Sequence, residues 1–478
     1  MSVLGHLEPQ KVFHFFEEIC AIPHGSRHNT QISNWLVKFA EDRGLEHYQD
    51  AAENVIIIKP ATPGYEKAEA VIIQGHMDMV CEKDADCTKD MLTEGLDLVL
   101  DGDTVSAKGT TLGGDDGIAV AMALAALDAD DLEHPRLEVV ITTDEELGMD
   151  GAVALDPAPL QARRLLNIDS EVEGVFTVSC AGGATSKVKI PVNCESFTGE
   201  VLTISVAGLV GGHSGVEINK GRANADMLLG RLLDAVSKVS EMRIISISGG
   251  LKDNAIPTNA QAVVAVADTA AVKAACSKLG EAFCGEYALT DPDLKVEVTE
   301  GGEGATMDAD STKRVICLLN CVPNGVQVMS NDIEGLVQTS LNLGVLRTEE
   351  NEVVASFLVR SSMDSQKEML IARLECLSAQ LGGVVETSAN YPGWAYRQES
   401  PLRDLMVKVF TEQYGHAPEI EAIHAGLECG LFAGKMPGLD CISFGPDLKE
   451  IHTPRERMSV ASVQRTWKLL VEVLRQMK

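Results

Sequence analysis

Short runs of β-branched residues that alternate with helical segments constrain the fold of this chain more than any other feature. Residues 54–59 (NVIIIK) and 70–75 (AVIIQG) are apolar enough for strands that are buried on both faces. Residues 115–129 (DDGIAVAMALAALDA) carry apolar side chains on every side, as a buried helix does. Residues 137–143 and 165–169 have the pattern of further strands. This order predicts an α/β domain with a mixed, largely parallel sheet between helices.

The pattern changes after about residue 185 and returns after about residue 390. Strands are expected inside this insertion at residues 202–207 and 353–359, and amphipathic helices at 223–239, 270–283, 312–320 and 365–381. The first pattern returns with helices at 402–413 and 459–476 and strands at 420–423 and 440–444. We therefore expect a catalytic domain formed by residues 1–185 and 391–478. This domain is interrupted by an inserted α+β lid domain of residues 186–390. The pattern of the insertion suits two small subdomains.

Charge and cysteine usage exclude several classes of function and location. The net charge of −31 repels phosphate backbones, which argues against nucleic-acid binding. Twelve cysteines are scattered without a CxxC pair, as in proteins of a reducing compartment. The N-terminus has no signal-peptide pattern, and the longest apolar stretch, residues 118–127, is too short for a membrane span. We therefore expect a cytoplasmic protein without a membrane partner.

Histidine and acidic residues stand where the predicted strands end. His76 and Asp78 lie two apart, so on a strand they point to the same side, at the edge where open α/β sheets place their sites. Glu145 and Glu146 follow the strand 137–143, and Asp115 opens the alanine-rich helix within GGDDG. Taken singly, each motif is also compatible with an ordinary structural role, such as a helix cap or a solvated loop.

Asp169 ends the strand 165–169, and His452 lies near the end of the chain in EIHTP. The sites are separated by tens to hundreds of residues, which excludes a zinc finger. Together the motifs supply imidazole and carboxylate ligands without thiolates. That ligand set suits Zn²⁺, Mn²⁺ or Co²⁺ in a catalytic site.

The ordered motifs HMDMV, GGDDG, DEELGMDGA, NIDSE and IHTPRE resemble those of the dinuclear zinc peptidases of the aminoacylase and glutamate-carboxypeptidase type. The similarity covers essentially the whole chain and is greatest to the aminoacyl-histidine (Xaa-His) dipeptidases, which cleave carnosine-like substrates. It implies two Zn²⁺ ions per chain, for which Co²⁺ or Mn²⁺ can substitute. The implied ligands are Asp115 as the bridge, His76 and Asp169 on one ion, and Glu146 and His452 on the other.

The resemblance also implies catalytic roles for three side chains. Asp78 would hold the imidazole of His76 from outside the ligand shell. Glu145 would act as general base, taking a proton from the attacking water and returning it to the leaving amine. His213, within GGHSG of the insertion, would donate to the oxyanion.

A dipeptidase must also recognise the free α-carboxylate of its substrate, for which the planar fork of arginine is suited. Arg360 resembles the carboxylate-binding arginine of the family, and Asn254 and Gly426 resemble its partners. Asp116 stands where histidyl-dipeptidases tend to carry asparagine, so a register in which Asp116 is the bridge stays open. We expect a cis peptide bond between Asp115 and Asp116.

The expected function is metal-dependent hydrolysis of dipeptides, preferentially Xaa-His. The alternatives are other substrates of the same family (a broad dipeptidase, a tripeptidase or an N-acyl-amino-acid amidohydrolase) and a non-enzymatic metal-dependent interaction protein. Homodimers formed through the lid occur in the family, while a long insertion can replace the partner subunit. Both a homodimer and a monomer therefore stay open.

Overall fold

The computed structural model describes residues 2–478 and groups them into two compact units. Unit 1 takes in the described part of Met1–Ser179 together with Tyr396–Ala422 and Leu427–Lys478. Unit 2 is Cys180–Ala395 and Ile423–Gly426. The chain therefore passes between the units four times.

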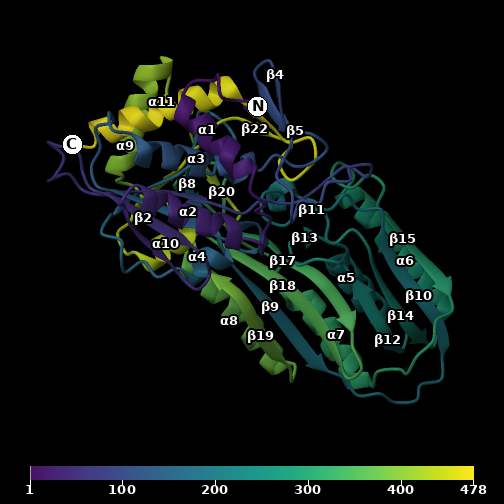
Figure 1. Ribbon diagram of the computed structural model, residues 1–478. Coiled ribbons are helices and arrows are strands. Elements are labelled where there is room, and N and C mark those ends of the chain that lie inside the picture. Colours follow the sequence, from purple (N-terminus) through teal and green to yellow (C-terminus); the bar gives the residue numbers. More distant parts are fainter. Residues whose placement is uncertain (1) are drawn as a thin grey trace. The chain divides into compact units, whose positions relative to one another are not determined.

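Unit 1 contains an eight-stranded mixed sheet, which confirms the α/β class (Figure 1). Its order is β1(Glu46–Gln49), β2(Val55–Lys59), β6(Leu137–Thr142), β3(Val71–His76), β7(Arg164–Asn167), β21(Asp440–Ser443), β8(Val175–Cys180) and β20(Glu419–Ile423). The central strand β3 runs parallel to β6 and β7, and β21 runs parallel to β7. Strands β1 and β2 extend the sheet in the antiparallel sense. The carboxyl ends of β6, β3, β7 and β21 therefore meet at one edge.

Burial explains the choice of residues in the centre of unit 1. Every residue of β3 and β6 is buried, as their β-branched runs predict. Helix α3(Gly114–Asp128) is buried on all sides, and α1(Gln10–Cys20) packs against it where Gly117 leaves room for Phe16 and Ile19. The other helices of this unit are α2(Thr30–Asp42), α4(Asp150–Ala154), α9(Pro401–Tyr414), α10(Glu428–Lys435) and α11(Val460–Gln476).

A second, smaller sheet of unit 1 is entirely antiparallel. Its order is β22(Leu448–Lys449), β23(Arg457–Ser459), β5(Thr104–Ala107) and β4(Leu98–Asp101). The loop that joins β22 to β23 spans residues 450–456 and carries His452.

Unit 2 is built on one nine-stranded antiparallel sheet, so the insertion does not divide into two small sheets. Its order is β15(Lys295–Glu300), β10(Glu200–Ala207), β14(Ala260–Val266), β12(Met242–Gly249), β17(Val337–Thr348), β18(Glu352–Ser361), β9(Gly182–Pro191) and β19(Val384–Tyr391), with β16(Gly325–Met329) paired to β17. Helices α5(Ala225–Ser237), α6(Thr269–Glu286), α7(Ala309–Cys321) and α8(Asp364–Gln380) pack along these strands (Figure 1).

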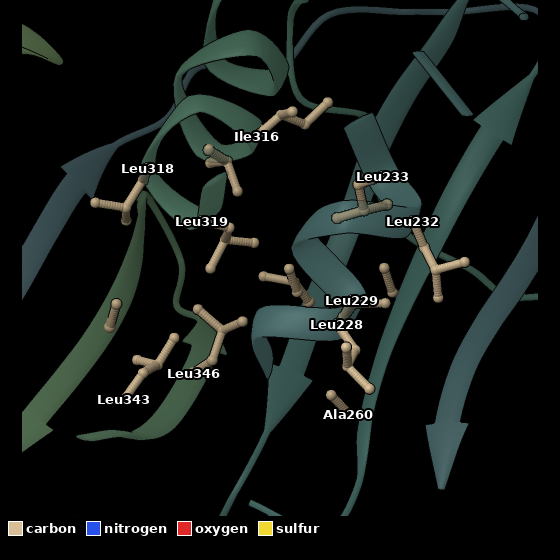
Figure 2. Close-up of a cluster of buried hydrophobic side chains, with 14 of the residues drawn as sticks. Leu228, Leu229, Leu232, Leu233, Ala260, Ile316, Leu318, Leu319, Leu343 and Leu346 are labelled. Atoms are coloured by element: carbon tan, nitrogen blue, oxygen red, sulfur yellow. The ribbon is translucent and has the colours of Figure 1, made fainter. Parts of the chain in front are cut away.

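Leucine side chains dominate the core of unit 2 (Figure 2). Leu228, Leu229, Leu232 and Leu233 recur at helical spacing on one face of α5, and all four are buried. They lie among side chains from α7 and from strands β14 and β17 (Figure 2). This amphipathic face explains why α5 packs on the sheet.

Short elements complete the two units. In unit 2, β11(Gly212–His213) pairs with β13(Ala255–Ile256) in a separate two-stranded sheet, and a 3-10 turn spans Ile218–Lys220. In unit 1, a 3-10 turn spans Glu145–Leu147 directly after β6. None of the helices in residues 2–478 is both long and apolar enough to cross a bilayer.

Candidate metal centre

Unit 1 gathers the five predicted ligands at one edge of its main sheet. His76 is the last residue of β3, Glu146 lies in the turn after β6, and Asp169 follows β7. Asp115 opens α3, and His452 is carried by the β22–β23 loop. Three of the ligands come from carboxyl ends of neighbouring parallel strands, which is where ligands bind open α/β sheets.

The carboxylate of Asp115 lies between the two imidazoles. Its Oδ1 is 3.1 Å from Nε2 of His76, and its Oδ2 is 3.2 Å from Nε2 of His452. Burial opposes ionisation of Asp115, yet the contacts with His452 and His76 hold the pKa of its carboxyl below the usual value. Each oxygen of one carboxylate thus faces a different nitrogen, as in a bridge between two cations.

Each imidazole faces a second carboxylate as well. Nε2 of His76 is 3.6 Å from Oδ1 of Asp169, and Nε2 of His452 is 2.8 Å from Oε1 of Glu146. Nδ1 of His76 is 2.9 Å from the carbonyl oxygen of Asp78, so Nδ1 carries a proton and Nε2 is the nitrogen that a metal ion can use. The carboxylate of Asp78 is farther from this ring, at 3.4 Å.

The donor set fits divalent cations. Three groups of side chains bring their ligand atoms within 4.8 Å of one another: His76, Asp116 and Asp169; His76, Glu145 and Glu146; and Asp115, Glu146 and His452. Among residues 2–478, no lysine or arginine forms an ion pair with Asp115, Glu146 or Asp169. Buried carboxylates require a compensating charge, and nitrogen and oxygen donors without sulfur suit Zn²⁺, Mn²⁺ or Co²⁺.

Asp116 occupies a different place from Asp115. Its Oδ2 accepts the backbone N–H of His76 at 3.2 Å, and its side chain is buried. Burial raises the pKa of this carboxyl well above its usual range. The peptide bond between Asp115 and Asp116 is cis, which confirms that expectation. Asp115 alone contacts both imidazoles, so the geometry favours it over Asp116 as the bridge.

Asp78 and Glu145 are joined by a hydrogen bond beside the ligands. Oδ1 of Asp78 accepts the backbone N–H of Glu145 at 3.0 Å, and its Oδ2 accepts the hydroxyl of Ser26 at 2.8 Å. Asp78 therefore holds the turn that carries Glu145. Burial raises the pKa of the Glu145 carboxyl well above its usual range, and the charges of Asp169 and other nearby acids add to this.

Unit 2 holds a buried arginine without an acidic partner. Arg360 lies in β18 opposite Ser340 of β17 and is 6% exposed. Its Nη1 is 3.5 Å from the hydroxyl of Tyr391, and no carboxylate among the described residues forms an ion pair with it. A buried, unpaired guanidinium is costly unless an anion joins it. Arg360 is thus a candidate anion-binding residue.

His213 belongs to the same region of unit 2. Its Nδ1 accepts the backbone N–H groups of Gly215 and Val216, each at 3.2 Å, so Nε2 carries the proton and can donate. Burial and the charge of Arg360 lower its pKa, which keeps the ring neutral. The carbonyl of Asn254 accepts the N–H of Ser214 at 2.9 Å, which places Asn254 beside this loop.

Three further buried side chains were not singled out from the motifs. His424 of unit 2 is two residues before Gly426, and its Nε2 is 2.7 Å from the hydroxyl of Ser340. In unit 1, Glu428 and Glu456 are both buried. Glu456 lies within the IHTPRE motif, where an acid four residues after the histidine was the only available signal.

Comparisons with known proteins identify the family of this chain. The model of the peptidase family M20/M25/M40 matches residues 72–476. The cytosol non-specific dipeptidase of Escherichia coli is 38% identical over 481 residues, covering 100% of this chain and 99% of the relative.

Solved structures give the same result. The aminoacylhistidine dipeptidase of Vibrio alginolyticus superposes with a TM-score of 0.94 at 37% identity, covering 99% of this chain and 98% of that one. The aminopeptidase PepT of Bacillus cereus shares the fold, with a TM-score of 0.57 at 17% identity over 98% of this chain and 99% of that one. With a family model and a full-length relative both matching, this chain belongs to the peptidase family M20/M25/M40.

Proposed function

We propose that this chain is a dipeptidase that uses two zinc ions and prefers Xaa-His dipeptides such as carnosine. The observation that carries the proposal is the position of Asp115, whose two oxygens each lie about 3 Å from a different histidine nitrogen. The names of the Escherichia coli and Vibrio alginolyticus relatives point to dipeptides as the substrate class. The name of the cytosolic relative and the twelve cysteines scattered without a CxxC pair support a cytoplasmic location.

The ligands divide between two metal positions. We assign His76 and Asp169 to one ion, Glu146 and His452 to the other, and Asp115 to both. The contacts of each imidazole with its own second carboxylate support this division. Co²⁺ or Mn²⁺ would occupy the same nitrogen and oxygen donors.

Hydrolysis then depends on Glu145 as the proton carrier. When bound, the zinc ions would acidify a water molecule and polarise the scissile carbonyl. Glu145 takes the proton of the attacking water and returns it to the leaving amine. Its buried carboxyl has a raised pKa, which brings it closer to the operating pH, as a general base requires. Asp78 holds the backbone of Glu145 in place.

Substrate recognition falls to unit 2. Arg360 would bind the free α-carboxylate in bidentate fashion, because it is buried and lacks an acidic partner. His213 would donate its Nε2 proton to the oxyanion, which its Nδ1 contacts leave available. We assign Asn254 and Gly426 to the same carboxylate-binding set, as the family motifs imply.

A substrate panel tests the proposal. Purified protein should hydrolyse carnosine and other Xaa-His dipeptides faster than non-histidyl dipeptides, tripeptides or N-acyl amino acids. Chelation should abolish hydrolysis, and added Zn²⁺ should restore it. Full activity after complete removal of metal would refute the mechanism. Faster turnover of tripeptides or N-acyl amino acids would reassign the substrate, and an inactive zinc-loaded protein would point to a non-enzymatic role.

A further inference from the structure

The loop that carries His452 also carries a buried acid. The β22–β23 loop turns through Glu450 and His452, whose φ angles of 52° and 59° are left-handed. It closes with the N–H of Glu456 donating to the carbonyl of Thr453 at 3.0 Å. Glu456 is only 2% exposed, and it pairs with no lysine or arginine among residues 2–478.

The carboxylate of Glu456 accepts the backbone N–H groups of four consecutive residues. Oε2 accepts those of Leu112 at 2.7 Å and Gly113 at 3.1 Å. Oε1 accepts those of Gly114 at 2.8 Å and Asp115 at 3.4 Å. These residues form the loop that enters α3 and ends on the bridging aspartate.

This contact satisfies backbone N–H groups of the turn that leads into α3, where Asp115 and Asp116 depart from helical φ and ψ angles. Gly113, the residue before the helix, supplies no side-chain cap. A carboxylate at this position gains charge-assisted hydrogen bonds to these N–H groups. The loop also has no spare room: a Cβ on Gly114 would lie 3.1 Å from Leu448 and 3.2 Å from Glu456.

We propose that Glu456 is a positioning residue of the metal centre, which rests on the dinuclear function proposed above. One carboxylate joins the backbone before Asp115 to the loop that carries His452. The 3.2 Å separation of Asp115 Oδ2 and His452 Nε2 therefore depends on this contact. Because Asp115 serves both metal positions, loss of the contact weakens the binding of both ions.

Glu456→Gln tests the proposal with little change in size. The amide keeps one oxygen but replaces the other acceptor, which receives two N–H groups, by an NH₂ donor. Zn²⁺ affinity of the metal-free protein is measured by competition with a chromophoric chelator. We expect Kd to rise about 10- to 100-fold, the range found for residues that support metal ligands indirectly.

Glu138→Gln is the control for loss of a buried carboxylate elsewhere in unit 1. Glu138 accepts the backbone N–H groups of Gln161 and Ala162 at 3.0–3.1 Å, and it also pairs with Arg136 at 2.9 Å. It lies near the start of β6, at the opposite end from Glu145. This variant should lose stability in urea while its Zn²⁺ affinity stays at the wild-type value.

The outcomes separate this inference from the proposed function. Wild-type Zn²⁺ affinity in Glu456→Gln, or an equal loss in Glu138→Gln, overturns the role of Glu456. If Glu456→Gln does not fold, Glu456→Asp, which keeps the charge but retracts it, must show weakened Zn²⁺ binding, and unchanged binding there overturns the role. Wild-type protein that binds Zn²⁺ tightly but cleaves no dipeptide refutes the proposed function and leaves the result on Glu456 intact.

Discussion

Replacing Glu428 by glutamine should change how the stability of the metal-free protein depends on pH. Glu428 is the first residue of α10 and is fully buried in unit 1. Its Oε2 accepts the amide of Gln74 and the hydroxyl of Thr142. Burial is the main cause that raises the pKa of the Glu428 carboxyl to about 7. The charge of His76 opposes this rise, and the charge of Asp169 adds to it.

The magnitude follows from linkage between proton binding and folding. The ordinary pKa of a glutamate is 4.5, so the folded state binds the Glu428 proton more tightly than the unfolded state does. Its contribution to stability is complete below pH 4.5 and is lost as pH rises through about 7. At about 1.4 kcal/mol per pKa unit, the loss between pH 5 and pH 8 is about 2.5 kcal/mol.

Urea unfolding of chelator-treated protein at pH 5 and pH 8 measures this loss. Trp35 and Trp467 report on unit 1, and a Trp394→Phe background removes the tryptophan of unit 2. Between pH 5 and pH 8, the unfolding free energy of the parent should fall by about 2.5 kcal/mol more than that of Glu428→Gln. Groups that do not sense Glu428 cancel in this comparison, whereas Glu145, whose pKa the charge of Glu428 helps to raise, shifts in the same direction in the variant. An equal fall in the two would refute a proton held on Glu428.

Three other predictions concern the chemistry and unit 2. Glu145→Gln should lower kcat by about 10²- to 10⁴-fold with full zinc content, and loss of zinc would instead make Glu145 a ligand. Arg360→Met should raise KM for dipeptides by about 10- to 100-fold, as expected for a lost hydrogen bond to a charged group. The KM for a C-terminally amidated substrate should stay unchanged. An equal rise for both substrates would contradict carboxylate binding. Burial and the charges of Arg360 and His213 lower the pKa of His424 to about 3, so unit 2 should lose stability as pH falls below about 6.5. His424→Gln should flatten this dependence in Trp394 fluorescence, and an unchanged profile would count against a buried neutral imidazole.

Local patterns predicted the central strands of unit 1 and the longer helices of unit 2, because such patterns depend on neighbours along the chain. The β-branched run at 70–75 became β3, displaced by one residue, and the alanine-rich run became α3. Period and composition decide such segments wherever they are buried. Helix α10 was not predicted, because its eight residues, Glu428–Lys435, include two glycines and have no side-chain cap.

The sequence by itself also indicated the candidate ligands, because imidazoles and acids that recur at successive strand ends are typical of a metal site in an α/β sheet. The resemblance to the zinc peptidases then distinguished Asp115 and Glu146 from the acids beside them. Only the tertiary structure decided how they meet. Asp115 and His452 are 337 positions apart, and their 3.2 Å separation depends on the order of strands and on the β22–β23 loop.

The contacts of the supporting side chains also depend on the tertiary structure. Glu456 meets the backbone of Gly114 across 342 positions, and Glu428 meets Gln74 across 354. A buried acid carries no periodic signal, since its role is set by the N–H and hydroxyl groups that folding brings to it. The chain therefore supplies the groups that can bind metal, and the fold decides which of them lie close enough to share an ion.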